Sequence, residues 1–391
     1  MKNQLLVVLV LCLGLTYYSY GQSDGTAQNF GIKWSGFVKT DYMFDTRQTV
    51  YAREGHFNIL PAAENIVDGD DLNDQSNFNI LAIQTRLKGT ITGPDFFGMK
   101  TSGVIEGAFF GNTDASTGEL RLRHAFVQLS NDKIEILMGQ YWHPMFVTAV
   151  FPGTYSFNTG VPFQPFSRNP QLRVTTKGKV KFIGVLFTER DFKTRGASVS
   201  QSGIPQFHAQ LQFGSVANSV GGVGFNLKTA RPALGEDNLS STAFIGYFRT
   251  KLGKATWKIE GTYGQNMSDV LMISGFGEAD GDYVNNDTFS MWTEFNGDFS
   301  ETMEWGLFGG YTKNDGFGEP ITYVNGFLGT VESAFRISPR VGWKSGNLKI
   351  GIEGEYTDAQ YGSIDNNGDI SSTGIDSVDN FRLLATAIYK F

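Results

Sequence analysis

The residues with the clearest chemical potential are basic side chains that stand two positions apart on predicted strands. Arg121 and Arg123 lie in the segment 120–130, and a strand points alternate side chains to the same face. Arg86 and Lys88 repeat this spacing on an earlier segment. Cations that line one wall of an enclosed, low-dielectric space attract anions electrostatically. The spacing therefore predicts a surface that favours anions, provided that the fold encloses it.

Residues that usually carry out catalysis are few and scattered. The chain has four histidines, which are His56, His124, His143 and His208. None of them belongs to a GxSxG or HExxH motif, and the only cysteine, Cys12, lies close to the N-terminus. The rest of the chain therefore offers no thiol nucleophile and no thiolate metal ligand. We predict that the protein is not an enzyme and that it needs no cofactor or metal.

The first 21 residues have the pattern of a secretory signal peptide. Lys2 supplies a positive start, the apolar run 5–15 follows, and Gly21 ends the segment. The run is too short to cross a bilayer as a helix, and no stop-transfer segment follows it. We therefore expect cleavage near Gly21, with residues 22–391 forming a single domain.

The composition is unusual for a soluble enzyme of this size. Charged residues make up only 18% of the chain, against about 25% in typical proteins, whereas aromatic residues reach 14% and glycine reaches 48 positions. This balance suits short strands with an apolar exterior rimmed by aromatic side chains. The net charge of −7 becomes −8 when Lys2 is removed (−7 − 1 = −8), which argues against a nucleic-acid partner.

The end of the chain alternates strictly between apolar and polar residues. Counting back by twos from the last residue gives an entirely apolar set, which is Phe391, Tyr389, Ala387, Ala385, Leu383 and Phe381. The opposite set includes Lys390, Thr386 and Arg382. This pattern predicts a strand with one face in lipid and the other in water or protein. Taken alone, it would also fit a half-buried strand of a soluble β-sandwich.

Similar alternation recurs along the mature chain in sixteen segments. They lie at about 32–45, 78–91, 99–111, 120–130, 133–142, 171–178, 180–190, 206–214, 220–229, 241–252, 255–266, 288–298, 303–313, 332–343, 348–358 and 378–391. Short gaps follow the even-numbered segments, and long gaps follow odd-numbered ones. Transmembrane barrels have this arrangement, with an even strand count, short periplasmic turns and long outer loops.

The segments therefore predict an all-β fold, a transmembrane antiparallel up-and-down β-barrel of about sixteen strands. Closure is required because an open sheet edge in lipid would leave backbone groups unpaired. A barrel of sixteen strands leaves an aqueous channel. The expected location is the outer membrane of a Gram-negative bacterium, where lipid and lipopolysaccharide would surround the barrel.

With these segments in place, the chain resembles the trimeric general porins and their dicarboxylate-type relatives. The likeness rests on the stretches 84–89 (QTRLKG), 120–129 (LRLRHAFVQL) and 138–142 (MGQYW), and on the long segment 143–170. The resemblance implies a homotrimer that lets small hydrophilic solutes diffuse passively, with a third outer loop folded into the barrel. The terminal Phe391 likewise resembles the signal that the barrel-insertion machinery recognises.

The resemblance also implies which residues form the pore. The basic residues carried over to the pore wall are Arg86, Lys88, Arg121, Arg123, Arg168, Arg173 and Lys177. The constriction loop would carry Phe146, Phe151, Tyr155, Phe157, Phe163 and Phe166. Such porins commonly have acidic residues on this loop, but the segment 143–170 has no Asp or Glu. We therefore predict an anion preference. The aromatic side chains would either contact ring-bearing or sugar solutes or only pack the loop against the wall.

The acidic residues of the chain concentrate in predicted outer loops. The stretch 365–369 places oxygen-bearing side chains at alternate positions, as calcium loops do, but its glycine comes too early for an EF-hand. A solvated polar loop is the favoured interpretation, with calcium binding as the alternative. Two alternatives to a porin also stay open. One is a barrel-anchored surface-binding or adhesion protein with a plugged lumen, and the other is an outer-membrane hydrolase.

Overall fold

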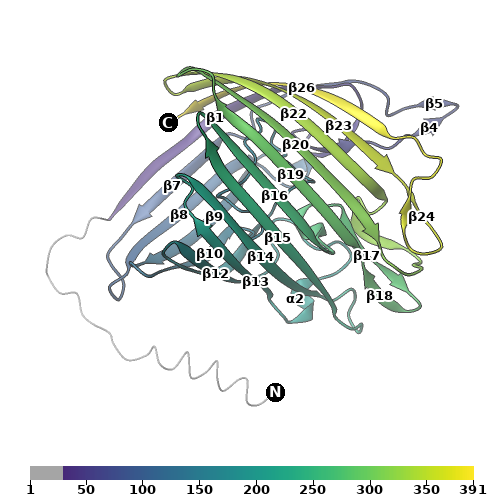
Figure 1. Ribbon diagram of the computed structural model, residues 1–391, viewed down its shortest axis with the longest axis horizontal. Helices are drawn as coiled ribbons and strands as arrows, with labels where there is room; N and C mark the ends of the chain where they lie inside the picture. The colour runs from purple at the N-terminus through teal and green to yellow at the C-terminus, as the bar shows by residue number, and fades with distance from the viewer. Residues whose placement is uncertain (1–29) are drawn as a thin grey trace, which may run out of the picture.

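The protein folds as a closed β-barrel, seen in a computed structural model that describes residues 30–391 (Figure 1). The predicted signal peptide, residues 1–21, lies outside the described residues. The barrel strands are β1 (Gly31–Asp45), β6 (Asn77–Leu81), β7 (Arg86–Thr92), β8 (Lys100–Phe110), β9 (Thr117–Ser130), β10 (Ile134–Trp142), β11 (Arg168–Thr176), β12 (Val180–Phe187), β13 (Gln206–Gly214), β14 (Ser219–Ala230), β15 (Leu239–Leu252), β16 (Ala255–Gln265), β19 (Asp287–Asp298), β20 (Met303–Gly316), β22 (Val331–Ser345), β23 (Leu348–Tyr361) and β26 (Val378–Lys390). Because β6 and β7 share one position beside β1, the wall has sixteen strand positions, as predicted.

The barrel closes where its first and last strands meet. β1 pairs with β26 in an antiparallel register that runs from Phe37 opposite Lys390 to Asp45 opposite Arg382. Beyond this register, two backbone hydrogen bonds of 3.1 and 3.2 Å join Gly36 to Phe391. The first and last strands therefore leave no open sheet edge to lipid between them.

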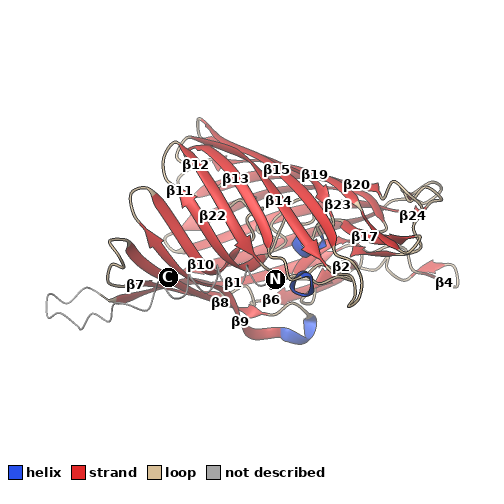
Figure 2. Ribbon diagram, turned by 90° about the horizontal axis from the view of Figure 1, so that it is seen from below, coloured by secondary structure: helices blue, strands red, loops and turns tan. Residues whose placement is uncertain are grey.

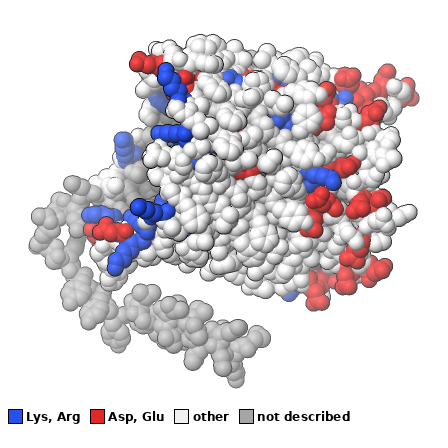
Figure 3. Space-filling view, in the orientation of Figure 1, with Lys and Arg blue, Asp and Glu red and all other residues white. Residues whose placement is uncertain are grey.

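The outer and inner faces of the wall differ as the alternation predicted. On β26, Phe381 and Leu383 are 43% and 46% exposed on the outside, whereas Arg382 between them is 1% exposed on the inside. Figure 3 shows the result as a broad white belt, with acidic residues gathered at the loop end and basic residues at the other. Apolar side chains on the outside and polar ones within are what a lipid-facing barrel requires. Within residues 30–391, no helix combines the length and apolarity needed to cross a membrane.

Long loops and short turns lie at opposite ends of the barrel. The outer loops are named L1 (46–76), L2 (111–116), L3 (143–167), L4 (188–205), L5 (231–238), L6 (266–286), L7 (317–330) and L8 (362–377). The turns at the other end include 131–133, 177–179, 253–254 and 346–347. In Figure 1 the loop elements β4, β5, β17, β18 and β24 project on the right, and the C-terminus lies with the turns on the left.

The loops carry short elements of their own. These are β2 (Thr49–Ala52), β3 (Phe57–Pro61), β4 (Ile66–Val67), β5 (Asp70–Asp71), η1 (Asp114–Ser116), α2 (Val199–Ser202), η2 (Ser268–Val270), β17 (Ser274–Ala279), β18 (Asp282–Asn285), β21 (Val324–Phe327), β24 (Ser363–Ile364) and β25 (Ile370–Ser371). β17, β18 and β21 form a small sheet that joins L6 to L7. Figure 2 shows that the wall is strand throughout and that the helical turns stay in the loops.

Among the predicted boundaries that differ from the structure, two shape the interior of the barrel. The segment 78–91 was expected to be one strand, but it is interrupted between β6 and β7 at residues 82–85. There the backbone N–H of Lys39 donates to the Thr85 hydroxyl at 3.1 Å, so a side chain replaces a ladder bond. The constriction loop was expected to reach residue 170, but β11 already begins at Arg168.

Much of the outer half of the lumen is filled by loops. All five residues of β3 in L1 are buried, and so is most of L3 and of the first half of L6. Phe57 of L1 packs against Phe157 and Phe166 of L3, with ring centroids 5.2 and 5.5 Å apart. L6 joins the same apolar cluster through Val270, whose carbonyl accepts the N–H of Phe166 at 2.9 Å. These loops therefore narrow the interior of the barrel.

Candidate functional site

L3 crosses the barrel interior and binds to the opposite wall, as predicted for the third outer loop. It leaves β10 and returns to β11, but its middle contacts β19 and β23 across the lumen. Glu353 accepts the backbone N–H groups of Tyr155 at 2.6 Å and Ser156 at 3.1 Å. Glu294 accepts the N–H of Gly153 at 2.8 Å. The acids that L3 itself lacks are thus supplied by the wall, where they fix the loop.

Glycines on the wall make room for this docking. Gly342 on β22 and Gly351 on β23 pair with each other across the sheet. A Cβ atom at Gly351 would overlap the ring of Tyr155, and one at Gly342 would overlap its phenol oxygen. The phenol oxygen of Tyr155 then reaches Glu304, to which it donates at 2.7 Å. The position of L3 is therefore set by shape as well as by hydrogen bonds.

Glu355 joins both inserted loops to the wall, so its loss should loosen them. It accepts the side-chain N–H groups of Asn58 in L1 at 2.9 Å and of Asn158 in L3 at 2.7 Å, beside the buried Arg336. We expect Glu355→Ala to lower the free energy of unfolding by about 3 kcal/mol, because Arg336 loses its carboxylate. It should also expose L3 to proteolysis. The matched control is Glu301→Ala, in an exposed turn. Equal unfolding midpoints and protease lifetimes for the two variants would contradict this role.

A cavity of about 530 Å³ lies beneath L3. Its lining comes from L3, from β7, β9 and β10 on one side, and from β20, β23 and β26 on the other. The charged residues that line it are Arg86, Arg123, Glu304, Lys349 and Lys390. This size falls within the usual range of about 300–1,000 Å³ for sites that hold small solutes.

Positive charge is in excess around this cavity. The side chains of Arg123 and Arg86 share one carboxylate, with their Nε atoms 2.8 and 3.4 Å from Glu106 Oε1. Lys349 pairs with Glu304 on the other side. Four cations thus face two carboxylates, which leaves an excess of two positive charges (4 − 2 = 2). Two of the predicted pore-lining residues, Arg86 and Arg123, therefore lie together on the cavity wall.

Two further predicted residues, Arg121 and Arg168, both pair with Asp191, an acid that the sequence analysis did not single out. Arg168 Nε and Nη2 lie 2.8 and 2.6 Å from Asp191 Oδ2, and Arg121 pairs with Asp191 Oδ1. Burial raises the pKa of the Asp191 carboxyl, but Arg168 and Arg121 outweigh burial and hold this pKa below its ordinary value. Asp191 belongs to L4, and nothing in its local sequence distinguishes it from solvated loop acids.

The remaining predicted basic residues lie apart from the cavity. Arg173 points inward from β11, where its Nη2 donates to the carbonyl of Trp142 at 3.0 Å. Lys88 alternates with Arg86 on β7 and is half-buried. Lys177 is exposed in the turn after β11 and donates to the Ser130 hydroxyl at 2.7 Å, so it lies at the rim.

The aromatic residues of L3 divide between the cavity and the loop's own packing. Phe146 stacks on Trp142 with ring centroids 3.9 Å apart, and Phe151 follows at 5.7 Å from Phe146. Phe151 is 42% exposed, so its ring faces the cavity. By contrast, Phe163 is buried against Phe308 on the wall. L3 thus holds one aromatic ring that faces the cavity and another that packs the loop against the wall, and contact with solutes stays a prediction.

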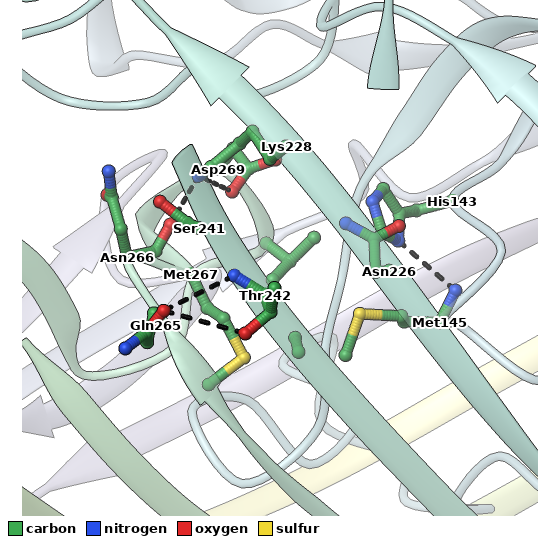
Figure 4. Close-up of a pocket in the computed structure, with 12 residues that line it drawn as sticks. His143, Met145, Asn226, Lys228, Ser241, Thr242, Gln265, Asn266, Met267 and Asp269 are labelled. Atoms are coloured by element: carbon green, nitrogen blue, oxygen red, sulfur yellow. Dashed lines mark hydrogen bonds and ion pairs between the residues drawn. The ribbon is translucent and has the colours of Figure 1, made fainter. Parts of the chain in front are cut away.

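A buried polar cluster fixes L6 to the wall beside L3 (Figure 4). Lys228 on β14 donates to Asp269 Oδ1 at 2.8 Å, and His143 accepts the N–H of Met145 at 3.1 Å through its Nδ1. The space among these residues is about 10 Å³, which is enough for about one water molecule. This cluster is therefore a structural link between loops and not a solute site.

Within residues 30–391, no group of three or more His, Cys, Asp and Glu side chains is placed to hold a metal ion. In the stretch 365–369, Asp365 Oδ1 accepts the backbone N–H groups of Asn367 at 2.8 Å and Asp369 at 3.0 Å. This arrangement is a turn closed by its own hydrogen bonds, which fits the polar-loop interpretation.

A closed antiparallel barrel of sixteen strand positions, with its third outer loop folded inside, defines the fold of the outer-membrane porins. No protein-family model and no curated protein matches the chain. Among solved structures, the outer-membrane channel DcaP of Acinetobacter baumannii has a TM-score of 0.73 at 17% identity, covering 93% of this chain and 97% of that one. The anion-selective porin from Comamonas acidovorans has a TM-score of 0.59 at 12% identity, covering 93% and 100%. A trimer form of OmpT from Vibrio cholerae has a TM-score of 0.55 at 12% identity, covering 93% and 99%. The chain has the porin fold.

Proposed function

We propose that this protein is an outer-membrane porin that lets small hydrophilic solutes diffuse passively and prefers anions. The observation that carries the proposal is the cavity beneath L3, where four cations face two carboxylates. An excess of positive charge between low-dielectric walls raises the local concentration of anions and disfavours cations. The porin fold, and its likeness to one protein described as an anion-selective porin, support the same function.

The surroundings of the barrel are part of the proposal. Its apolar belt would face the lipid and lipopolysaccharide of the outer membrane of a Gram-negative bacterium. The exposed terminal ring of Phe391, next to the closure of the barrel, would be recognised by the barrel-insertion machinery. A homotrimer is the proposed assembly, supported by the likeness to a protein with a trimer form.

One observation favours a second candidate, a barrel-anchored surface-binding protein with a plugged lumen. L1, L3 and L6 share one apolar cluster inside the outer half of the barrel. Loops packed together in this way would block the passage of solutes through the barrel in the plugged form. An outer-membrane hydrolase has no comparable support. For example, His208 Nε2 lies 3.2 Å from the Gln210 amide, and His143 contacts a backbone N–H.

Solute uptake into liposomes separates the porin from the plugged barrel. Vesicles that contain the refolded protein are diluted into isotonic solutions of small sugars or of potassium acetate, and swelling is followed by light scattering. A porin should cause swelling that slows as the solute becomes larger. Vesicles that hold folded barrel, shown by its heat-dependent electrophoretic mobility, and that never swell would contradict the proposed function and favour the surface-binding protein.

A further inference from the structure

A second cavity lies on the loop side of the barrel, above the paired Arg121 and Arg168. Its volume is about 340 Å³, and residues of L2, L4 and L6 line it. The charged residues of its lining are Arg190, Asp191, Lys193 and Arg195. Three of these are exposed cations, whereas Asp191 is buried. Positive charge therefore prevails at the mouth of this cavity, which favours the approach of anions.

The Arg168–Asp191 pair stands between this outer cavity and the one beneath L3. Asp191 lines the outer cavity, whereas Trp142 and Phe166 line the inner one. The guanidinium of Arg168 lies over both of these rings, 5.3 Å from the Trp142 centroid and 5.7 Å from that of Phe166. The pair is therefore a partition between the two cavities, with one face toward each.

The geometry around Asp191 is that of a bound carboxylate. Arg168 contacts one carboxylate oxygen through two nitrogen atoms, and Arg121 contacts the other oxygen. Arg168 is 1% exposed, and its remaining nitrogen, Nη1, has no hydrogen-bond partner among the described residues. Guanidinium groups that converge in this way bind planar carboxylates strongly. The side chain of Asp191 is thus equivalent to an acetate ion held by two arginines.

Asp191 lies in a short stretch of L4 and not in a wall strand, although its backbone N–H donates to the carbonyl of Arg168 at the start of β11 at 3.3 Å. Its carbonyl accepts the side-chain N–H of Asn112 in L2 at 2.7 Å. On one side, the Thr194 N–H donates to Glu189 at 3.1 Å, and Lys228 Nζ reaches the Thr194 hydroxyl at 3.0 Å. The neighbouring Lys193 is exposed. Withdrawal of Asp191 would break its backbone hydrogen bond to Arg168 and the ion pairs with Arg168 and Arg121, but it requires movement of this L4 stretch and of no wall strand.

We propose that Asp191 is a tethered carboxylate that occupies an anion site between Arg121 and Arg168, and that a small permeating carboxylate takes its place there. The claim that permeating anions pass through this site rests on the proposed function, whereas the existence of the anion site does not depend on it. Asp191 would limit the flow of anions at the partition, because each anion competes with a carboxylate that cannot diffuse away.

The first test compares Asp191→Asn with the wild-type channel in planar bilayers. At about 0.1 M potassium acetate, where screening extends over about 10 Å, we expect acetate conductance to rise roughly two- to fivefold. The amide keeps the size of the side chain but removes its charge. Asp237→Asn, in the exposed part of L5, is the matched control and should change conductance little. Arg121→Gln, which weakens the site, should instead lower acetate conductance. Unchanged conductance in Asp191→Asn and Arg121→Gln would overturn the proposal.

The second test measures the anion site directly and does not need a conducting channel. Because Cys12 lies within residues 1–21, Asp191→Cys places a single thiol in residues 22–391. The folded variant is treated with two thiol reagents of similar size, one carrying a sulfonate and one a quaternary ammonium group. For each variant, the rate with the sulfonate reagent is divided by the rate with the ammonium reagent. This ratio should be at least about tenfold higher for Asp191→Cys than for the control Ser200→Cys on exposed L4. Equal relative rates would overturn the anion site. A clear preference without conductance would refute the porin but keep the site.

Discussion

Replacing Arg86 and Arg123 together by glutamine is expected to abolish most of the anion preference of the channel. These two side chains account for the whole excess of positive charge around the cavity beneath L3, since two cations would then face two carboxylates. We expect the permeability ratio of chloride to potassium to fall by roughly an order of magnitude. The ratio is obtained from the reversal potential in a potassium chloride gradient.

The control for this double variant is Lys100→Gln combined with Lys133→Gln. It removes the same charge from exposed positions at the end of the barrel that carries the short turns, where neither residue lines the cavity. The single variant Arg86→Gln should give an intermediate ratio, and it leaves the buried pair of Arg123 and Glu106 intact. If the double variant and its control shift the ratio equally, the cavity is not the origin of the selectivity.

Removal of the inserted part of L1 is expected to have the second large effect. A chain in which a short glycine-serine link replaces residues 49–61 lacks β2 and the wholly buried β3. The wall strands β1 and β6 keep their mutual pairing, so the barrel should still close. We expect the single-channel conductance to rise several-fold, because an unobstructed barrel of sixteen strands contains a wide aqueous channel.

The outer tip of L1 provides the control for this deletion. Replacing residues 66–70 shortens the exposed β4–β5 hairpin but keeps Asp71, which pairs with Arg47 at 2.6 Å. This variant should conduct like the wild type. An unchanged conductance in the variant without residues 49–61 would mean that the inserted hairpin does not narrow the path.

The wall of the barrel could be predicted from sequence because its physical requirement repeats at every second residue. Lipid outside and polar side chains within impose an alternation that is visible on each strand, as Phe381, Arg382 and Leu383 illustrate on β26. The alternation of long and short gaps between successive segments then supported an even count of about sixteen strands. The break at 82–85 escaped prediction because the Thr85 hydroxyl replaces a backbone bond without disturbing the composition of the segment.

The interior of the barrel could be predicted only in part. Arg86 and Arg123 were expected on the pore wall, and they lie on the cavity beneath L3. Glu353 and Glu355 were visible only as polar residues on an alternating strand, since their partners in L3 and L1 lie about 200 and 300 residues away in the chain. Asp191 was not singled out at all. Long-range contacts of this kind have no period in the sequence, so only the folded structure reveals them.

The absence of acids from L3 had a consequence that the sequence did not foresee. The sequence predicted a pore whose basic residues are not paired with acidic ones. Instead, Glu106 and Asp191 neutralise part of the basic wall, while Glu294 and Glu353 hold the loop itself. The proposed anion preference therefore depends on a small excess of charge within a dense network of ion pairs. Small changes of charge at this network should have large effects on selectivity.

The reversal potential of the wild-type channel in a potassium chloride gradient tests the central claim most directly. The refolded protein is inserted into a planar bilayer of neutral lipid, and single-channel currents are recorded across the gradient. The proposed function predicts open steps with a reversal potential displaced toward the equilibrium potential of chloride. Open steps displaced toward that of potassium would contradict the assignment of an anion-preferring porin.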